Sequence, residues 1–304
     1  MNVLIKGGSG FLGLHLLNNL QESQPSANIY ISSSREEAAN ENVLFVNYEI
    51  FESVASLFLR TKPDYIFHLA SNCVRDCSDN SLKKGQLRDD NILKALSVLE
   101  LSSKFIFVSS MAVFSMSDKE VTPMKYHPES NYGLEKLYMI NKLLDFSVGN
   151  KKVKWKVVYP SSIYGKGQNG KMFLPRLLEH IEQERLMVAF GGNKKRDFVH
   201  VKDVSRMLVK LVLDFDTILH KHIFVNSFVL YKISEIADLV CSILQLDPKK
   251  VVRFDDSQED VEKHSLDFQT ILEIDCFCYE FAESVSLLEG LQEMFGDVGQ
   301  IIGQ

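Results

Sequence analysis

A glycine-rich turn near the amino terminus constrains the fold of this chain more than any other feature. Residues 2–6, NVLIK, are a short apolar run typical of a buried strand, and GGSGFLG follows directly. Gly7, Gly10 and Gly13 are spaced three apart, and a helical pattern begins at Phe11. Glycines let such a turn approach a pyrophosphate closely, and the helix amino terminus offers it free N–H groups. Because the turn joins a strand to a helix, it predicts a dinucleotide-binding site.

Strand-like and helix-like segments alternate from this turn to about residue 160. The strand-like runs are rich in β-branched and aromatic residues: NVLIK, NIYIS, VLFVN, YIFHLA, KFIFVSS and WKVVYP. The segments between them have helical patterns: FLGLHLLNNLQ, FESVASLFLR, ILKALSVLELS and YGLEKLYMINKLLDFS. This alternation is typical of α/β proteins, and it predicts a Rossmann-like, doubly wound parallel sheet.

The rhythm loosens after YPSSIYGKG, and no flexible linker separates the two halves of the chain. Helical patterns there are FLPRLLEHIEQE, VKDVSRMLVKLVLD, SEIADLVCSIL and SVSLLEGLQEMF, with short strands LMVAF and HIFVNSF. We predict a dinucleotide-binding domain over residues 1–165 and a smaller α/β substrate-binding domain over residues 166–304. Some strands or helices of the second could return to the first. A ligand is expected in the cleft between them.

Composition and charge exclude several classes of protein. The chain of 304 residues is 45% hydrophobic and 24% charged, as globular domains are. Its net charge of −6 argues against nonspecific binding to nucleic acid or membranes. It has no apolar run of membrane-spanning length and no signal peptide, so we expect a cytoplasmic protein.

The five cysteines do not predict a disulfide framework. Cys73 and Cys77, and Cys276 and Cys278, have no suitably placed histidines, so we expect buried or idle thiols and no metal site.

The end of the second strand, ISSSREE, indicates the type of cofactor. An acid there would bind the adenosine ribose hydroxyls of NAD, but Ser33 occupies that place. Ser34 and Arg35 follow, and hydroxyls with a guanidinium suit a 2′-phosphate. The sequence favours NADP, with NAD as the alternative. If the segment is only a surface loop, Arg35 binds no ligand.

The segment YGLEK places Tyr132 and Lys136 four residues apart, on one face of a helix. If both face solvent, the pair is ordinary helix surface. If both face a cofactor, the ammonium favours the phenolate and makes the tyrosine usable as an acid and base.

These motifs occur together with others in a characteristic order. DYIFHLAS covers residues 64–71 and FVSSMAVFS residues 107–115; YPSSIYGKG covers 159–167 and KKRDFVHVKDV 194–204, before a carboxyl-terminal SLLEGL. The ordered set resembles the extended short-chain dehydrogenase/reductase family, of the nucleotide-sugar epimerase/dehydratase/reductase type, over almost the whole chain.

The resemblance implies roles for individual residues. Ser110 would hydrogen-bond the reacting sugar oxygen, Tyr132 would exchange its proton, and Lys136 would hold the nicotinamide ribose. His68 would be structural. The expected cofactor contacts are Gly7, Gly10, Phe11, Leu12, Gly13, Ser33, Ser34, Arg35, Leu69, Ala70, Ser71, Tyr132, Lys136, Tyr159, Pro160 and Ser162. The expected substrate contacts are Ser110, Met111, Lys171 and Arg196.

Lys166, Lys171, Lys194 and Lys195 could add a cationic cluster for a nucleotide diphosphate, or be solvated loop charges.

The chain also departs from the family pattern. Lys6 stands where the family usually has a small or hydroxyl residue, and YPSSIYG lacks the arginine and asparagine often found there. No arginine near Asp267 has the spacing with which relatives grip the diphosphate. Met111 and Ala112 replace the Asp-Glu pair of 4,6-dehydratases, which makes dehydration an unexpected reaction.

Three hypotheses for function follow. The sequence favours NADPH-dependent reduction of a 4-keto-deoxysugar attached to a nucleotide, because reductases consume NADPH. The alternatives are an NAD(P)-dependent nucleotide-sugar 4-epimerase and a non-catalytic dinucleotide-binding scaffold. A homodimer could form through the helix that begins at YGLEK, although its apolar stripe could equally face the core.

Overall fold

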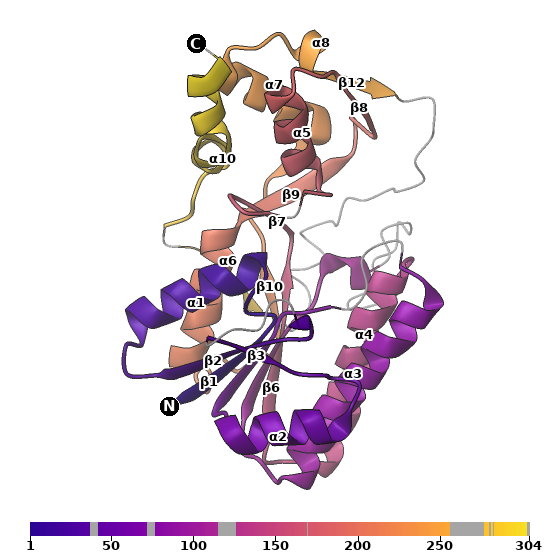
Figure 1. Ribbon diagram of the computed structural model, residues 1–304, viewed down its shortest axis with the longest axis vertical. Coiled ribbons are helices and arrows are strands. Elements are labelled where there is room, and N and C mark those ends of the chain that lie inside the picture. The colour runs from indigo at the N-terminus through magenta and orange to yellow at the C-terminus, as the bar shows by residue number, and fades with distance from the viewer. Residues whose placement is uncertain are drawn as a thin grey trace.

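The protein has two lobes, joined where the strands of a large sheet end (Figure 1). The computed structural model describes residues 1–36, 42–71, 77–114, 126–168, 170–255, 277–279, 281 and 283–302. The amino terminus lies in the lobe built around the large sheet, here the sheet lobe. The carboxyl terminus lies in the smaller lobe above it, here the cap lobe.

The sheet lobe contains most of the first half of the chain and three segments from the second half. Its elements are β1 (Asn2–Lys6), α1 (Phe11–Ser23), β2 (Asn28–Ser33), β3 (Val43–Phe45), α2 (Phe51–Thr61), β4 (Tyr65–His68), α3 (Asp79–Val98), β5 (Lys104–Val108), the short 3-10 helix η2 (Met111–Val113), α4 (Asn131–Gly149), β6 (Lys154–Pro160), α6 (Val201–Leu213), β10 (His222–Val225) and β13 (Phe277–Cys278).

The large sheet has eight strands among the described residues, in the order β13-β10-β6-β5-β4-β1-β2-β3. All neighbouring pairs are parallel. The order runs outward from β1 in both directions, so the crossover helices cover both faces. This confirms the predicted Rossmann-like α/β fold. Because parallel strands end at one edge, the turns after β1, β2, β4 and β5 gather there.

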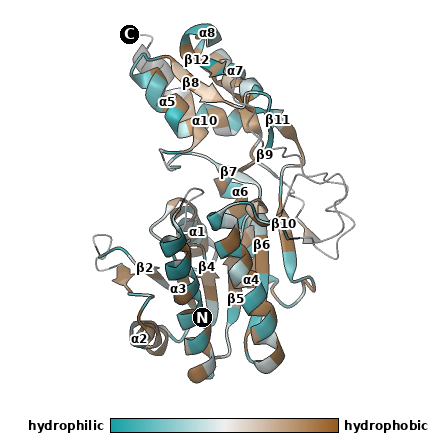
Figure 2. Ribbon diagram, turned by 90° about the vertical axis from the view of Figure 1, so that its right-hand side faces the viewer, coloured by the Kyte–Doolittle hydropathy of each residue, from teal (hydrophilic) through white to brown (hydrophobic). Residues whose placement is uncertain are grey.

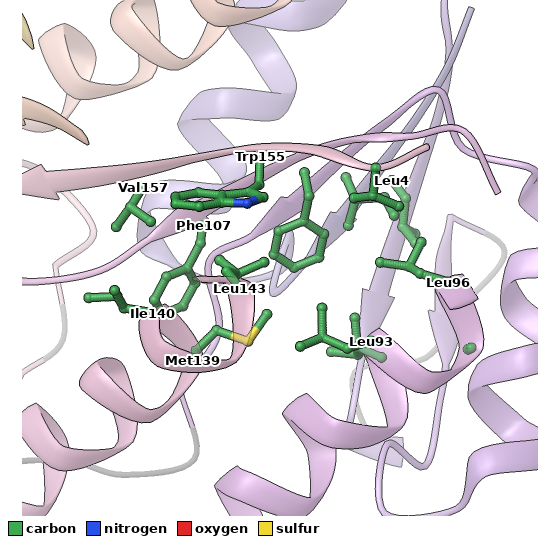
Figure 3. Packing of buried hydrophobic residues seen from close by; sticks show 14 of the residues in the cluster. Leu4, Leu93, Leu96, Phe107, Met139, Ile140, Leu143, Trp155 and Val157 are labelled. Carbon is green, nitrogen blue, oxygen red and sulfur yellow. The ribbon is translucent and has the colours of Figure 1, made fainter. Parts of the chain in front are cut away.

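Two hydrophobic cores lie on the two faces of the sheet. One packs Leu16 and Leu20 of α1 and the apolar side of α6 against β1, β4, β5 and β6. The other packs α2, α3 and α4 against the opposite face; Met139, Ile140 and Leu143 of α4 reach toward Trp155 (Figure 3). In Figure 2 the strands β5 and β6 are mainly hydrophobic, whereas α4 alternates between hydrophobic and hydrophilic residues. The apolar stripe of α4 therefore faces the core, and a homodimer stays a prediction.

The cap lobe has its own core. Its elements are β7 (Ser162–Tyr164), α5 (Phe173–Glu182), β8 (Met187–Phe190), β9 (Lys195–His200), β11 (Leu230–Lys232), α7 (Ile233–Leu244), α8 (Pro248–Val251), β12 (Val252–Asp255) and α10 (Leu287–Ile302). Strands β11, β9 and β7 form a mixed sheet, and β8 pairs with β12. Helices α5, α7 and α10 enclose buried side chains such as Leu177, Ile236 and Phe295.

Three segments of the second half return to the sheet lobe. The run HIFVNSF contains β10, which pairs with β6 in the large sheet, β13 pairs with β10 at the edge, and α6 packs beside α1. Helix α3 also differs from the prediction, since it begins at Asp79, well before the expected ILKALSVLELS. Its first half is polar and carries no apolar periodicity, but Ser78 caps it by accepting a hydrogen bond from Ser81 N. The division of domains at residue 165 stays a prediction.

Among the helices of the described residues, none combines the length and apolar character that crossing a bilayer requires.

Candidate active site

The glycine turn between β1 and α1 is a backbone cradle. Gly7 has φ of +86°, a conformation that residues with side chains rarely adopt. A Cβ atom on Gly13 would lie 2.4 Å from the carbonyl oxygen of Gly7, so only glycine permits this contact. Gly10 caps α1 without any side-chain hydrogen bond, which leaves the first N–H groups of the helix for a ligand. These residues, with Phe11 and Leu12, therefore fit the pyrophosphate of a dinucleotide.

The end of β2 presents a small polar turn at the same edge of the sheet. Ser33 is buried, and its Oγ accepts a hydrogen bond of 3.1 Å from the backbone N of Arg35. Ser34 and Arg35 are exposed. The hydroxyl of Ser33 thus shapes the turn. The exposed side chains of Ser34 and Arg35 can reach a ligand bound at this edge of the sheet. Their contact with a 2′-phosphate stays a prediction.

The loop of residues 69–71 lies between the glycine turn and α4. The carbonyl oxygen of Lys6 accepts hydrogen bonds from the backbone N of Leu69 (3.1 Å) and of Ala70 (3.3 Å). On the other side, Ser71 Oγ donates to Glu135 Oε2 on α4 at 3.0 Å. The three predicted loop residues are therefore held between the two elements that carry the other predicted cofactor contacts.

Ser110 and the start of α4 are brought together by a close backbone contact. Ser110 Oγ accepts a hydrogen bond from Ala112 N at 3.2 Å, which caps η2 and leaves the hydroxyl proton available. A Cβ atom on Gly133 would lie only 2.3 Å from the carbonyl oxygen of Ala112. Gly133 also donates to its N-cap Ser130, so the first turn of α4 is fixed against η2.

Tyr132 and Lys136 lie in this part of α4 and share a face. Lys136 is 3% exposed, and its Nζ donates to the carbonyl oxygen of Val108 at 2.9 Å. The same Nζ lies 5.7 Å from the centre of the Tyr132 ring and 4.9 Å from that of Phe107. Because Lys136 points toward β5, YGLEK is not ordinary helix surface. The ammonium can stabilise a phenolate at residue 132.

Tyr159 lies in the core rather than facing open space. Its side chain is fully buried, and its hydroxyl is hydrogen-bonded to Tyr126 (2.9 Å) and to Nδ1 of His222 (3.0 Å). Its ring stacks on Phe224, and burial raises the pKa of the phenol. Its side chain is therefore committed to packing, so any contact of residue 159 with a cofactor falls to its backbone. Pro160 is buried as well, and Ser162 is half-buried at the start of β7.

The predicted substrate residues come from both lobes. Met111, the first residue of η2, packs against the core. Arg196 is half-buried on β9, where its Nη1 donates to the carbonyl oxygen of Lys195 at 3.0 Å. Lys171 is exposed just before α5. The cationic cluster of Lys166, Lys171, Lys194 and Lys195 stays a prediction.

Two buried acids next to this site had no predicted role. Asp89 on α3 is 3% exposed and Glu135 on α4 is 4% exposed. Asp89 Oδ1 lies 2.8 Å from Nε2 of His68, which is itself buried. A signal was present for Asp89, since it occupies the same helical face as the buried Ile92 and Leu96.

One cysteine is oxidised rather than the free thiol expected from the sequence. Cys77 is disulfide-bonded, so the expectation of idle thiols is wrong there. Cys73, Cys276 and Asp267 lie outside the described residues. Within the described ranges, no three His, Cys, Asp or Glu side chains are grouped as ligands for a metal ion.

The chain is similar to known proteins over most of its length. The model of the NAD dependent epimerase/dehydratase family matches residues 3–225. A GDP-6-deoxy-D-talose 4-dehydrogenase from Aggregatibacter actinomycetemcomitans is 24% identical over 255 residues, which cover 80% of each chain. A UDP-glucose 4-epimerase from Streptococcus mutans is 25% identical over 237 residues, covering 67% of this chain and 70% of that one.

The structure also superimposes on that of a UDP-glucose 4-epimerase from Thermotoga maritima solved with UDP-glucose. The TM-score is 0.77 at 22% identity, over 99% of this chain and 100% of the other. At that identity the likeness concerns the fold, and it extends through both lobes.

Proposed function

The chain is an enzyme of the NAD dependent epimerase/dehydratase family, and from that premise we propose that it is a nucleotide-sugar 4-epimerase. The observation that carries the proposal is the Tyr132–Lys136 pair, with the ammonium anchored on Val108 beside η2 and Ser110. Such a pair can take a proton from a sugar hydroxyl and return it, as epimerisation requires. The names of the relatives agree, since several are 4-epimerases.

The cofactor would be held by the glycine turn, by the loop of residues 69–71 and by Lys136. When bound, its nicotinamide would supply the hydride acceptor and donor that epimerisation at sugar C4 needs. NAD(P) fits the cradle because Gly7, Gly10 and Gly13 leave room for a backbone approach to the pyrophosphate.

The protein's own contribution is the movement and orientation of one proton. Tyr132 Oη accepts the proton of the C4 hydroxyl and later gives it back to the same oxygen. Ser110 can donate a hydrogen bond to that oxygen, because its Oγ accepts from Ala112 N and its own proton is not used there. Lys136 stabilises the phenolate form of Tyr132 before it accepts the proton and after it returns it. With Met111 and Ala112 after Ser110, no acid is available at that place to eliminate water.

Reduction of a 4-keto sugar by NADPH is the second candidate. The sequence favours it through Ser33, Ser34 and Arg35, and one relative is named a 4-dehydrogenase. Both reactions use the same three catalytic residues. They differ in whether the cofactor is consumed, which makes them separable by experiment.

The test is to incubate the purified protein with NAD or NADP and, one at a time, UDP-glucose, UDP-galactose and other nucleotide-sugars. We expect the C4 epimer to appear by NMR without net change in nicotinamide absorbance. Tyr132→Phe should still bind the cofactor but lose about 10²–10⁴-fold in turnover, because the proton has no carrier.

Three outcomes would redirect the proposal. Stoichiometric consumption of NADPH with a 4-keto-deoxysugar nucleotide would identify a reductase. Turnover unaffected by Tyr132→Phe would remove that residue from the mechanism. Cofactor binding without turnover of any sugar in the panel would favour the scaffold.

A further inference from the structure

Lys6 is a buried cation that the proposed reaction does not use. It is the last residue of β1, directly before the glycine turn, and it is 7% exposed. The apolar surroundings include Phe58 and Phe105, and the remaining space is too small for a water molecule. A buried ammonium needs partners from the protein. Its Nζ lies 3.3 Å from Nε2 of His68 and 4.9 Å from the centre of the Tyr48 ring.

His68 links Lys6 to a buried carboxylate. The same Nε2 atom lies 2.8 Å from Asp89 Oδ1, while Nδ1 of His68 is buried without a hydrogen-bond partner. One ring nitrogen cannot donate its proton to Asp89 and accept a proton from Lys6 at the same time. The protons of Lys6, His68 and Asp89 are therefore distributed as a unit, which we call the Lys6 triad.

The triad lies directly beneath the loop that is predicted to pass the cofactor. His68 is followed at once by residues 69–71, and the backbone oxygen of Lys6 binds Leu69 N and Ala70 N. Lys6 thus holds the start of this loop twice, through its backbone and through its side chain. The ring of His68 also contacts that of Phe107, at 5.2 Å between centres.

The other end of the loop is held by α4. Ser71 donates to Glu135 Oε2, and Gly85 of α3 packs so closely against Glu135 that a Cβ atom there would lie 2.6 Å from the carboxyl carbon. Gly85 and Asp89 are one turn apart on α3, so this helix supports both ends of the loop. The loop therefore connects the glycine turn to the helix of Tyr132.

We propose that Lys6 is a positioning residue for the dinucleotide: through the Lys6 triad, its charged side chain holds residues 69–71 in the register that the bound cofactor needs. The inference depends on the dinucleotide-binding part of the proposed function and not on which sugar reacts. It also gives a physical reason for a lysine at the position where a small or hydroxyl residue was expected.

The position of Lys6 makes this support sensitive to pH. Burial lowers the pKa of Lys6 to about 8, Asp89 and Glu135 act to raise it, and Lys136 and Arg88 lower it further. Tyr48 and His68 face it as well, and burial lowers the pKa of His68 to about 4, so that histidine stays neutral. Above about pH 8 the ammonium is progressively deprotonated, and the triad loses its cation.

Deprotonation of Lys6 has opposite effects on the stability of the fold and on the proposed positioning of the cofactor. A lysine whose pKa is lowered on folding binds fewer protons in the folded than in the unfolded chain between about pH 8 and its ordinary value of 10.5. Its contribution to the free energy of unfolding therefore rises with pH in that range. Cofactor affinity should fall in the same range, so a loss of binding there is not a loss of fold.

The experiment measures the dissociation constant of NADH and NADPH by fluorescence titration between about pH 7 and pH 9.5. No sugar is present. We expect affinity in the wild-type protein to fall about tenfold or more across this range, since only the protonated form is competent. Lys6→Met should bind more weakly at neutral pH and show a flat profile. Thermal unfolding at each pH provides the readout of stability.

Two further variants keep the test decisive. Lys6→Met leaves Asp89 without its cation and could fail to fold. In that case the double variant Lys6→Met/Asp89→Asn, which removes both charges, is used instead. It should also give a flat profile. Lys156→Met is the matched control, because Lys156 is also a buried lysine, 3% exposed, and donates to the carbonyl oxygens of Ile218 and His220. It should keep the wild-type slope.

The inference is overturned if the Lys6 variants retain the wild-type pH slope, or if they change the melting temperature while binding NADH as the parent does at every pH. It is overturned together with its premise if the wild-type protein binds neither cofactor. A protein that binds with the expected slope but epimerises no sugar refutes the proposed function alone. Epimerisation with pH-independent cofactor binding refutes this inference alone.

Discussion

At the scale of single residues, the candidate active site depends on buried polar groups with few, fixed partners. The backbone oxygen of Val108 in β5 accepts a hydrogen bond from Lys136, and Ser71, in the loop of residues 69–71, donates one to Glu135. A buried polar group that is left unpaired costs about 1–3 kcal/mol, so these contacts determine side-chain positions strongly. Arg35 differs from these buried groups, because it is exposed and its expected role is to bind a ligand.

Arg35→Ala therefore tests the choice of cofactor. Loss of a charge-assisted bond to a 2′-phosphate should weaken NADP binding about tenfold or more and leave NAD binding unchanged. Isothermal titration with each dinucleotide measures both affinities. Arg60→Ala, which removes another exposed arginine at the end of α2, should change neither. Equal affinities for NAD and NADP in the parent protein would contradict the prediction of NADP.

At the scale of elements, α4 combines packing and chemistry in one helix. Met139, Ile140 and Leu143 anchor its middle in the core, as Figure 3 shows. Its first turn is placed by the Ser130 cap and by the contact of Gly133 with the backbone of η2. The helix thereby fixes Tyr132 relative to Ser110, although the two residues lie far apart in the sequence of the crossover between β5 and β6.

Gly133→Ala should disturb this placement. The added methyl would lie 2.3 Å from the oxygen of Ala112, and relieving such overpacking costs about 1–3 kcal/mol. Thermal unfolding should show lower stability, and turnover should fall because Tyr132 and Ser110 move apart.

Gly149→Ala is the matched control at the other end of α4, where a Cβ atom would meet nothing within 4 Å. That change should be neutral or stabilise the helix by up to about 1 kcal/mol. If both substitutions have the same effect, the contact with η2 does not position the helix.

At the scale of the whole molecule, Asp197 of β9 ties the cap lobe to the sheet lobe. Its carboxylate accepts hydrogen bonds from Ser161 Oγ, from Ser227 N and Oγ, and from Phe228 N, at 2.8–3.0 Å. Ser161 follows β6 and Ser227 follows β10, so the contacts cross the junction of the lobes. Burial raises the pKa of Asp197, whereas the four donors favour its charged form.

Asp197→Asn should loosen this junction. An amide NH₂ cannot accept the bonds that one carboxylate oxygen receives, so donors are left unpaired and stability falls by about 2–4 kcal/mol. Denaturant unfolding measures the loss, and the two lobes should then unfold less cooperatively. Asp216→Asn removes an exposed partner of Lys104 and Lys154 and should have a much smaller effect. Similar losses for both variants would mean that Asp197 has no special role.

The order of strands and helices, the glycine turn and the membership of the family could be predicted from the sequence, because each depends on local periodicity or on motifs in a fixed order. The six strand-like runs of the first half are strands of the large sheet, and the Rossmann-like fold is confirmed. The start of α3 was missed because its first half is polar.

The tertiary structure decided which distant residues share a buried space. Lys6, His68 and Asp89 come from β1, β4 and α3, and only the packing of those elements reveals that they form one charged group. The same holds for β10, whose apolar run fits either lobe, and for Tyr159, whose hydroxyl is taken up by Tyr126 and His222. Sequence patterns report which face of an element is buried, whereas the partner of a buried polar group is chosen by contacts across the whole chain.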